Sequence, residues 1–353
     1  MNAAEILELY RSDERIKSIA GKLGEKKPTS LHLRGLVGSA PSIIAAAIFK
    51  DTTCNHLFIC NDKEEAAYFQ NSLKNMLDQK DVFFFPDSFK KPGIFEQVNN
   101  TDILQRAEVV NRLSHAHTKS ELVVTYPEAL FERVVEKKIL AKNTLHLKIN
   151  EKVDVEFMVE LLVQYEFERV DFVYEPGQFS VRGGIVDIFS FGNELPYRVE
   201  LFGNEVESIR TFDPSSQLST RKISQVDIVP NIQTHFTTAQ KTSFFEILPK
   251  NTTVWVRDLQ FMVERLDRAF ESAVSMYEAV KAGKRTVNDD EADFFQDEPI
   301  KTFELSSKVL DDIFDLPLIQ FNNVAQGTPD AVFEFNLTPQ PAFNKNFELL
   351  ISN

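Results

Sequence analysis

The sequence has little cysteine and no long hydrophobic run. Only Cys54 and Cys60 occur among its 353 residues, and their spacing matches no metal or redox motif, so we expect two reduced, buried thiols. No apolar stretch approaches the roughly 20 residues that span a bilayer. Met1 is followed by an acidic amphipathic segment rather than by a signal peptide. These absences argue against a disulfide scaffold and a membrane protein, and they predict a cytoplasmic chain.

Basic charge is also scarce. The 39 lysines and arginines are outnumbered by 53 aspartates and glutamates, which leaves a net charge of −14. A chain this acidic repels a polyphosphate unless its basic residues cluster locally. The nearest cluster, residues 22–27, is interrupted by Glu25. Nucleic acid is therefore not expected to be the main ligand of this chain.

No set of residues suggests catalysis or metal binding. His115 and His117 are two positions apart near a predicted helix end, so they do not share a helical face and do not resemble a metal site. The remaining histidines are scattered, and no pairing of a nucleophile with a base can be assembled. The sequence therefore predicts no catalytic residue, no metal site and no cofactor.

The first 140 residues alternate between helix-like and strand-like segments. After an amphipathic helix over residues 3–23, the predicted strands are residues 31–37, 56–60, 82–85 and 122–125. The predicted helices are residues 42–49, 64–77, 103–113 and a segment that begins at Pro127. Such alternation is typical of a parallel sheet covered by helices on both faces. We therefore predict an α/β domain over residues 1–140.

Residues 142–219 are predicted to form a second, α+β domain, in which a helix over residues 155–165 precedes an array of strands. Glu175-Pro176-Gly177-Gln178 suits a type II turn, because proline fixes φ at its second position and glycine allows a positive φ at its third. Gly203-Asn204 suits a two-residue loop between strands at residues 197–202 and 205–212. The array therefore has its turns specified by sequence.

The rest of the chain is mixed. It contains a buried strand at residues 252–256, a long helix at 259–282, an acidic loop at 288–298, and short strands at 300–305 and 318–321. A helix pattern starts at residues 343–351 but has no stop signal before Asn353. This ending predicts a piece cut from a longer protein.

A glycine-containing loop follows the first predicted strand, where a phosphate-binding loop belongs. Its candidate residues are Gly35, Gly38, Ser39, Ala40, Pro41 and Ser42. A working P-loop needs glycine and lysine at the positions that Ala40 and Pro41 occupy, because the backbone must approach the phosphates and the lysine must pair with them. A pair of acids should also follow a buried strand, yet here Asp258 is followed by Leu259. The placement indicates P-loop ancestry, and the residues predict no ATP hydrolysis.

Arg169 and Arg182 lie within apolar, strand-like sequence rather than in loops. One interpretation is that each forms an ion pair within the chain, with Glu168, Asp171 or Glu175 as the partner. The other is that a sheet face presents them beside exposed apolar residues, which is the usual composition of a protein–protein hot spot.

Phe179 and Val186 are the apolar residues that we expect beside these arginines. Asp187 follows directly in the same apolar run, and we expect a buried carboxylate that is hydrogen-bonded to the neighbouring backbone. Because Gly183-Gly184 could form a bulge, the sequence alone does not decide which residues share a face with Arg182.

Residues 170–219, VDFVYEPGQFSVRGGIVDIFSFGNELPYRVELFGNEVESIRTFDPSSQLS, closely resemble the second domain of the bacterial transcription-repair coupling factors (Mfd). They are more distantly similar to the matching domain of the excision-repair helicase UvrB. The runs FFPDSFKKPGIFEQVNNTDILQRAEVVNRL and TPQPAFNKNFELL also look like this family. The resemblance covers nearly the whole chain, as the UvrB-homology module that begins a much longer protein.

The resemblance implies a UvrB-like fold: a degenerate P-loop, helicase-like α/β domain built from residues 1–140 and 220–340, with a small α+β domain inserted at 142–219. Residues 341–353 would start the next domain or linker. The DNA-clamping hairpin of UvrB would be absent. The small domain would recruit UvrA, and Arg169 and Arg182 fall on motif positions whose arginines contact UvrA in the relatives. Ser180 departs from UvrB, which has a further arginine there.

The resemblance also implies partners outside this sequence. In the full-length family protein a C-terminal domain masks the UvrA-binding surface until RNA polymerase is engaged, and the missing domains bind polymerase and move along DNA. We therefore expect a non-catalytic recruitment module. Two alternatives remain: an ATP-dependent, UvrB-like DNA-remodelling subunit, and a purely autoinhibitory domain that binds its own C-terminal half.

Overall fold

The computed structural model describes residues 2–24, 29–77, 82–88, 100–114, 120–284, 297–322 and 324–338. The predicted helix start at residues 343–351 lies outside this part of the chain, as does most of the predicted acidic loop at 288–298.

Within the described part of the chain, the larger sheet has seven strands in the order β17-β1-β16-β15-β2-β4-β3, and all of its neighbouring strands are parallel. The strands are β1 (Ser30–Arg34), β2 (Asn55–Ile59), β3 (Phe83–Phe84), β4 (Leu122–Thr125), β15 (Thr252–Val256), β16 (Leu318–Gln320) and β17 (Ala331–Glu334). Strands from the first and last parts of the chain are interleaved in this order. The first and last thirds of the sequence therefore build one α/β domain.

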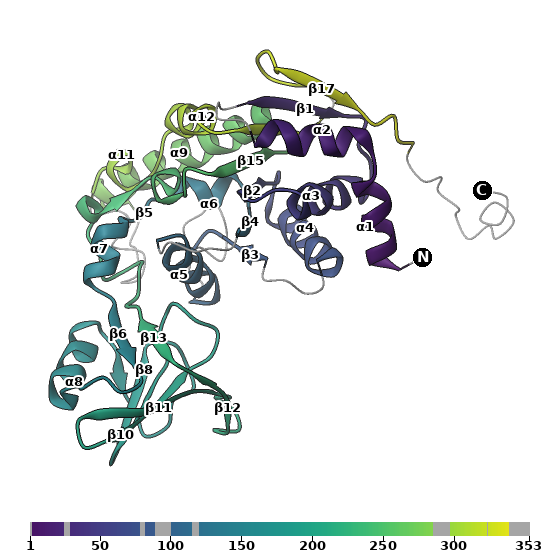
Figure 1. Cartoon of the computed structure of the whole chain (residues 1–353). Coiled ribbons are helices and arrows are strands. Elements are labelled where there is room, and N and C mark those ends of the chain that lie inside the picture. The colour runs from purple at the N-terminus through teal and green to yellow at the C-terminus, as the bar shows by residue number, and fades with distance from the viewer. Residues whose placement is uncertain are drawn as a thin grey trace, which may run out of the picture.

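Two groups of helices pack on this sheet, and apolar residues from the sheet and both groups form one continuous core. The first group is α1 (Ala3–Arg11), α2 (Glu14–Leu23), α3 (Ala40–Lys50) and α4 (Lys63–Met76). The second group is α6 (Pro127–Phe131), α9 (Leu259–Lys281), α11 (Pro299–Thr302) and α12 (Ser306–Phe314). Helix α5 (Asn100–Ser114) packs near β3, and α7 (Lys137–Lys142) leads out of the domain (Figure 1).

Smaller elements complete this domain. They are the two-stranded ribbon of β5 (Val134–Val135) with β14 (Lys241–Thr242), and the 3₁₀ turns η1 (Thr238–Gln240) and η2 (Phe244–Ile247). Cys60 is buried as expected, Cys54 is only half-buried, and both are free thiols. Within the described ranges, none of the helices combines the length and apolarity needed to cross a bilayer.

Two predicted elements of this domain are wrong. The single helix over residues 3–23 is two helices, because Asp13 accepts a hydrogen bond from the Arg15 backbone N–H and caps a new helix. The strand at residues 300–305 is instead the short helix α11, followed by extended backbone. Its first helical residue is Pro299, whose fixed φ suits a helix start.

The small domain is inserted between α7 and η1, and it lies to one side of the larger sheet (Figure 1). Strands β6 (Leu145–Lys148) and β13 (Gln225–Ile228) pair antiparallel where the chain enters and leaves it. Since β13 ends at Ile228 and packs into the core of this domain, the predicted boundary at residue 219 is too early.

Six strands of the described chain form the main sheet of the small domain, in the order β12-β11-β10-β9-β8-β7. They are β7 (Glu168–Arg169), β8 (Gln178–Arg182), β9 (Ile185–Ile188), β10 (Tyr197–Phe202), β11 (Glu205–Phe212) and β12 (Ser219–Ile223). Helix α8 (Val155–Gln164) places Met158 and Leu162 in the core against one face of this sheet.

Both predicted turns of this domain are confirmed. The Gln178 N–H donates to the Glu175 carbonyl oxygen at 3.2 Å, and Gly177 has φ +82°, as a type II turn requires. A Cβ at Gly177 would lie 2.6 Å from Cζ of Phe191, so the packing also requires glycine. Strands β10 and β11 have the predicted bounds on either side of Gly203-Asn204.

Candidate functional site

Successive side chains of β8 and β9 point to opposite faces of the sheet, and this decides which residues a partner could contact. Phe179 and Val186 point to the face that α8 covers, and both side chains are fully buried in the small core. They therefore have no surface to offer to a partner. The prediction that they contact a partner beside the arginines is corrected by this burial.

Asp187 lies on the opposite face of the same sheet, and it too is fully buried. The register pairs it with Ser180 on one side and with Arg198 on the other. Arg198 donates from Nε to Oδ1 at 2.8 Å and from Nη2 to Oδ2 at 2.9 Å. This hydrogen bonding raises the pKa of Arg198. The buried carboxylate was predicted, but its partners are arginines on neighbouring strands rather than nearby backbone.

Arg182 is the second arginine on Asp187. Its Nη2 donates to Asp187 Oδ2, and its Nη1 donates to the Asp171 carbonyl oxygen at 2.9 Å. The guanidinium carbon lies 5.0 Å from the centre of the Phe172 ring, within the range of a cation–π contact. The ion pair considered from sequence therefore exists, but with Asp187 rather than with Glu168, Asp171 or Glu175.

Arg182 nevertheless stays accessible, with 37% of its side chain exposed. A guanidinium has five N–H groups, and the two hydrogen bonds above use two of them. Three donors remain for a partner. Arg198, by contrast, is 16% exposed, and it also donates to the Gln217 carbonyl oxygen at 3.1 Å. The two arginines that bind Asp187 thus differ. Arg198 is structural, and Arg182 is accessible at the surface.

The segment between Arg169 and the turn at Gly177 crosses the polar face of the sheet instead of forming a strand. It is fixed there by Ser180 Oγ, which donates to the Asp171 carbonyl oxygen at 3.0 Å, and by Gln217 Nε2, which donates to that of Val173 at 3.0 Å. Val173 is buried with Phe189 and Phe212 in a separate small apolar cluster. The segment is therefore held in one place.

Two aromatic side chains on this segment are exposed: Phe172 at 51%, whose ring contacts Arg182, and Tyr174 at 55%. The exposed apolar side chains near this arginine therefore come from this segment, and not from Phe179 and Val186 as predicted. The sequence around Phe172, VDFV, favours a strand because it combines aromatic and β-branched residues. The run of polar and turn-forming residues after it was the available signal that the strand ends early.

Arg169 lies at the end of β7, the edge strand of the sheet, and is exposed. Its parallel register partner is Phe179, so its side chain leaves the sheet on the face opposite Arg182. Its guanidinium has no hydrogen bond or ion pair with any other described residue. The two arginines are thus not side by side on one face. They lie on either side of one sheet edge.

The loop that contains the candidate P-loop residues joins β1 to α3. Pro41 occupies the second helical position and is buried, together with Ala40 and Ser42. The Ser42 hydroxyl donates to the Ser39 carbonyl oxygen at 2.9 Å. Gly38 has φ +58° and lies at the exposed tip of the loop.

The segment after β17 packs against the start of this loop. The Leu337 N–H donates to the Gly35 carbonyl oxygen at 3.1 Å, and a Cβ at Gly35 would lie 2.9 Å from the backbone nitrogen of Asn336. Gly35 is therefore required by packing as well as by its φ of +76°. Asp258, the single acid after β15, accepts the Phe261 N–H at 3.0 Å and caps α9.

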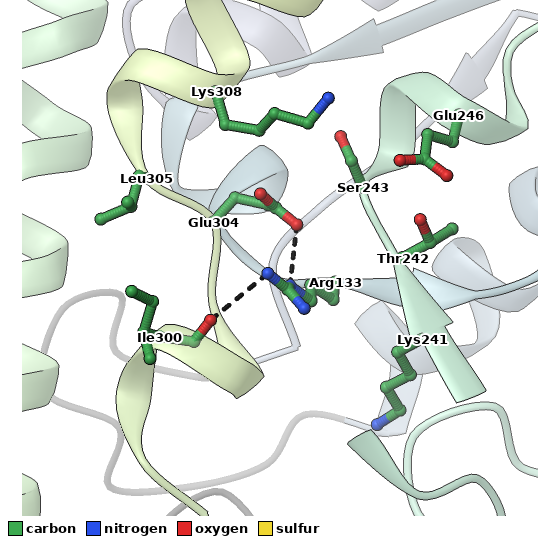
Figure 2. Close-up of a pocket in the computed structure, with 9 residues that line it drawn as sticks. All are labelled: Arg133, Lys241, Thr242, Ser243, Glu246, Ile300, Glu304, Leu305 and Lys308. Atoms are coloured by element: carbon green, nitrogen blue, oxygen red, sulfur yellow. Dashed lines mark hydrogen bonds and ion pairs between the residues drawn. The ribbon is translucent and has the colours of Figure 1, made fainter. Parts of the chain in front are cut away.

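A second feature, missed from sequence, is a cavity of about 290 Å³ in the α/β domain (Figure 2). It is lined by Arg133, Lys241, Thr242, Ser243, Glu246, Ile300, Glu304, Leu305 and Lys308. These residues come from separate segments that only the fold brings together.

Four of the five charged side chains of this cavity have partners among the described residues, and the exception is the exposed Glu246. Arg133 Nε lies 2.7 Å from Glu304 Oε1, and its Nη2 donates to the Ile300 carbonyl oxygen at 3.3 Å (Figure 2). Lys308 pairs with Asp312 at 2.6 Å, and Lys241 Nζ donates to the Gln233 carbonyl oxygen at 2.9 Å. Burial raises the pKa of Glu304. The cavity is a weaker candidate than the sheet edge, where Arg169 and Arg182 retain free donors.

Comparison with known proteins identifies the inserted domain. Residues 145–236 match the family of the UvrB interaction domain. The chain is 28% identical over 221 residues to the transcription-repair-coupling factor of Bacillus subtilis, an alignment that covers 62% of this chain and 18% of that protein. It is 25% identical over 253 residues to the factor of Staphylococcus haemolyticus, which covers 69% of this chain and 21% of that protein.

A UvrABC system protein B, from Ureaplasma parvum, is 28% identical over 193 residues, which covers 52% of this chain and 29% of that protein. These matches confirm the resemblance to the UvrB-like module of the transcription-repair coupling factors. The chain spans less than a third of the length of each of these relatives.

Proposed function

We propose that this chain, whose residues 145–236 match the UvrB interaction domain, is a module that recruits UvrA in nucleotide excision repair. The single observation that carries the proposal is Arg182. It is ordered by a buried carboxylate, partly exposed, in contact with the exposed ring of Phe172, and left with three unused donors. Central arginines with aromatic neighbours are the residues that dominate the affinity of protein–protein interfaces.

The surface that binds UvrA is, in this proposal, the edge of the small sheet at β7 and β8. Arg169 and Arg182 lie on opposite faces at this edge, so UvrA would contact both sides of it rather than a flat face. A longer protein that contains this module would couple UvrA to a stalled RNA polymerase through its other domains. The relatives named as transcription-repair-coupling factors support this context.

We further propose that the α/β domain is UvrB-like, with a degenerate P-loop, and that it does not turn over ATP. Pro41 supplies neither the lysine charge nor a backbone N–H at its position. Asp258 caps a helix, and Leu259 stands where a second acid would be needed. The domain would then serve as the support from which the inserted domain extends.

The test is an isothermal titration of this chain with UvrA. We expect Arg182→Ala to weaken binding by about 2 kcal/mol, roughly 30-fold, as for a central arginine anchor. Arg268→Ala is the matched control, because it removes the same charge from an exposed position on α9 in the other domain. The control should bind UvrA like the wild type. Equal affinity of a folded Arg182→Ala variant would disprove the site, and lack of binding by the wild type would disprove the function.

Two further measurements address the alternatives. ATP turnover by the wild-type chain would favour a DNA-remodelling subunit. Binding to the C-terminal part of a full-length coupling factor, without binding to UvrA, would favour an autoinhibitory domain.

A further inference from the structure

Arg182 is held from three directions although its side chain is partly exposed. Asp187 lies behind it, the Asp171 carbonyl oxygen accepts from Nη1, and the Phe172 ring covers one face of the guanidinium. Two of these contacts are themselves fixed. Asp187 is bound by Nε and Nη2 of Arg198, and the Asp171 carbonyl also accepts from Ser180 Oγ. The orientation of the guanidinium is therefore set before any partner arrives.

The charges around Arg182 leave its positive charge available. Asp187 is shared between two arginines, so one of the two positive charges is not neutralised by it. The exposed carboxylates of Glu168, Asp171 and Glu175 form no ion pair with Arg182, since only the backbone oxygen of Asp171 is bonded. The free N–H groups of a planar guanidinium match the two oxygens of a carboxylate.

We infer that Asp187 is a positioning residue for partner binding and that Phe172 and Arg182 act as one unit, which receives a carboxylate of UvrA. The inference rests on the proposed function and adds the chemistry of the contact. Asp187 fixes the orientation of the Arg182 guanidinium. Phe172 shields one face of this guanidinium from water, which strengthens an ion pair formed by the remaining N–H groups. Holding the arginine beforehand also removes part of the ordering cost of binding.

A double-mutant cycle tests the role of Asp187. Asp187→Asn keeps an oxygen that can accept from Arg198 but removes the charge that orients Arg182. We expect it to weaken UvrA binding about tenfold in the wild-type background and to have no effect in the Arg182→Ala background. If its effects are equal in both backgrounds, Asp187 acts through the fold in general and the inference is wrong. Thermal unfolding of each variant establishes that the comparison is made between folded proteins.

A second double-mutant cycle uses Phe172, an exposed residue whose substitution leaves the buried core unchanged. Phe172→Leu keeps an exposed apolar side chain and removes the ring. We expect a loss of about fivefold with Arg182 present and no loss with Arg182→Ala. Equal losses in the two backgrounds would show that Phe172 contacts UvrA independently. Tyr174→Leu is the matched control: its ring makes no cation–π contact with Arg182, and its effect should be the same in both backgrounds.

Salt dependence tests the carboxylate. An ion pair is screened, so the affinity difference between wild type and Arg182→Ala should shrink as NaCl rises from about 0.05 to about 0.5 M. A difference that does not change with salt would indicate a neutral acceptor on UvrA instead. The possible failures are distinguishable. A wild type that does not bind UvrA disproves the proposed function and this inference together, whereas normal binding with additive variants disproves this inference alone.

Discussion

Arg198 binds both oxygens of Asp187 from the neighbouring strand, at 2.8 and 2.9 Å, in a pair that the sheet buries. The guanidinium also lies 4.6 Å from the centre of the Phe212 ring. A buried carboxylate is tolerated only when such partners compensate its lost hydration. The ion pair of Arg198 with Asp187 therefore stabilises the small domain. Arg198 thus has a structural role, whereas Arg182 is available to a partner.

The first prediction follows from this difference between the two arginines. Arg198→Ala should lower the free energy of unfolding by about 3 kcal/mol, because it removes the bidentate partner of a buried charge. Arg182→Ala should lower it by about 1 kcal/mol or less, since Arg198 still holds Asp187. Urea denaturation of the chain without UvrA measures both. A larger loss for Arg182→Ala than for Arg198→Ala would contradict the assignment.

The second prediction concerns the turn before β8. Gly177→Ala should destabilise the protein by about 2–3 kcal/mol, because φ is +82° and the new Cβ would lie 2.6 Å from Phe191. Gly203→Ala is the control in the same domain, with φ +61° and no atom within 4 Å of its Cβ. It should cost only about 1 kcal/mol. Thermal unfolding of the two variants compares them, and equal losses would mean that the contact with Phe191 relaxes freely.

The third prediction concerns pH. Burial, and then the nearby Glu132 carboxylate, raise the pKa of Asp87 from 3.8 to about 7, although Tyr126 donates to its Oδ1 at 2.6 Å. The folded protein therefore keeps a proton that the unfolded chain releases. The stability that this group contributes is present at low pH and is lost as pH rises through this interval.

Asp87→Asn should remove that part of the pH dependence. We expect the free energy of unfolding of the variant to fall less than that of the wild type between pH 4 and pH 7. Urea denaturation at several pH values provides the measurement. Parallel pH profiles for the two proteins would show that Asp87 titrates normally in the folded state.

The fourth prediction concerns the degenerate P-loop. The wild type should neither bind nor hydrolyse ATP. The double substitution Ala40→Gly and Pro41→Lys supplies the two residues that the motif lacks, and Ser42 already suits the Mg²⁺ position. We expect this variant to bind Mg-ATP in a titration without hydrolysing it, because Leu259 provides no second acid. ATP hydrolysis by the wild type would contradict the prediction.

Local patterns predicted much of this fold. The strands on either side of Gly203-Asn204 and the turn at Gly177 were predicted at the residue level, because each depends on short-range chemistry. The parallel sheet followed from alternating helices and strands. The strand predicted at residues 300–305 is wrong because so short a segment, IKTFEL, does not distinguish a strand from a helical turn. Pro299 before it starts a helix.

The candidate site was predicted less completely. Sequence singled out Arg169 and Arg182, but not the partner of Arg182, because that depends on which residues of β8 and β9 face each other. The register brings Asp187 beneath Arg182 and puts Phe179 and Val186 on the buried face. Phe172 and Tyr174 were missed for a related reason: their exposure depends on a segment that folds back over the sheet.

The small domain is connected to the rest of the molecule by two strands, β6 and β13, that lie side by side (Figure 1). Their ladder runs from the pair Leu145–Ile228 to the pair Lys148–Gln225, and His146 is bonded to Asp227 across it at 2.6 Å. A pulling force on the small domain is thus shared by the two strands β6 and β13. The hydrogen bonds between them resist twisting about their common axis. A rotation of a protein bound at the sheet edge would therefore be transmitted to the α/β domain through both strands. A connection by one strand would let the small domain rotate freely.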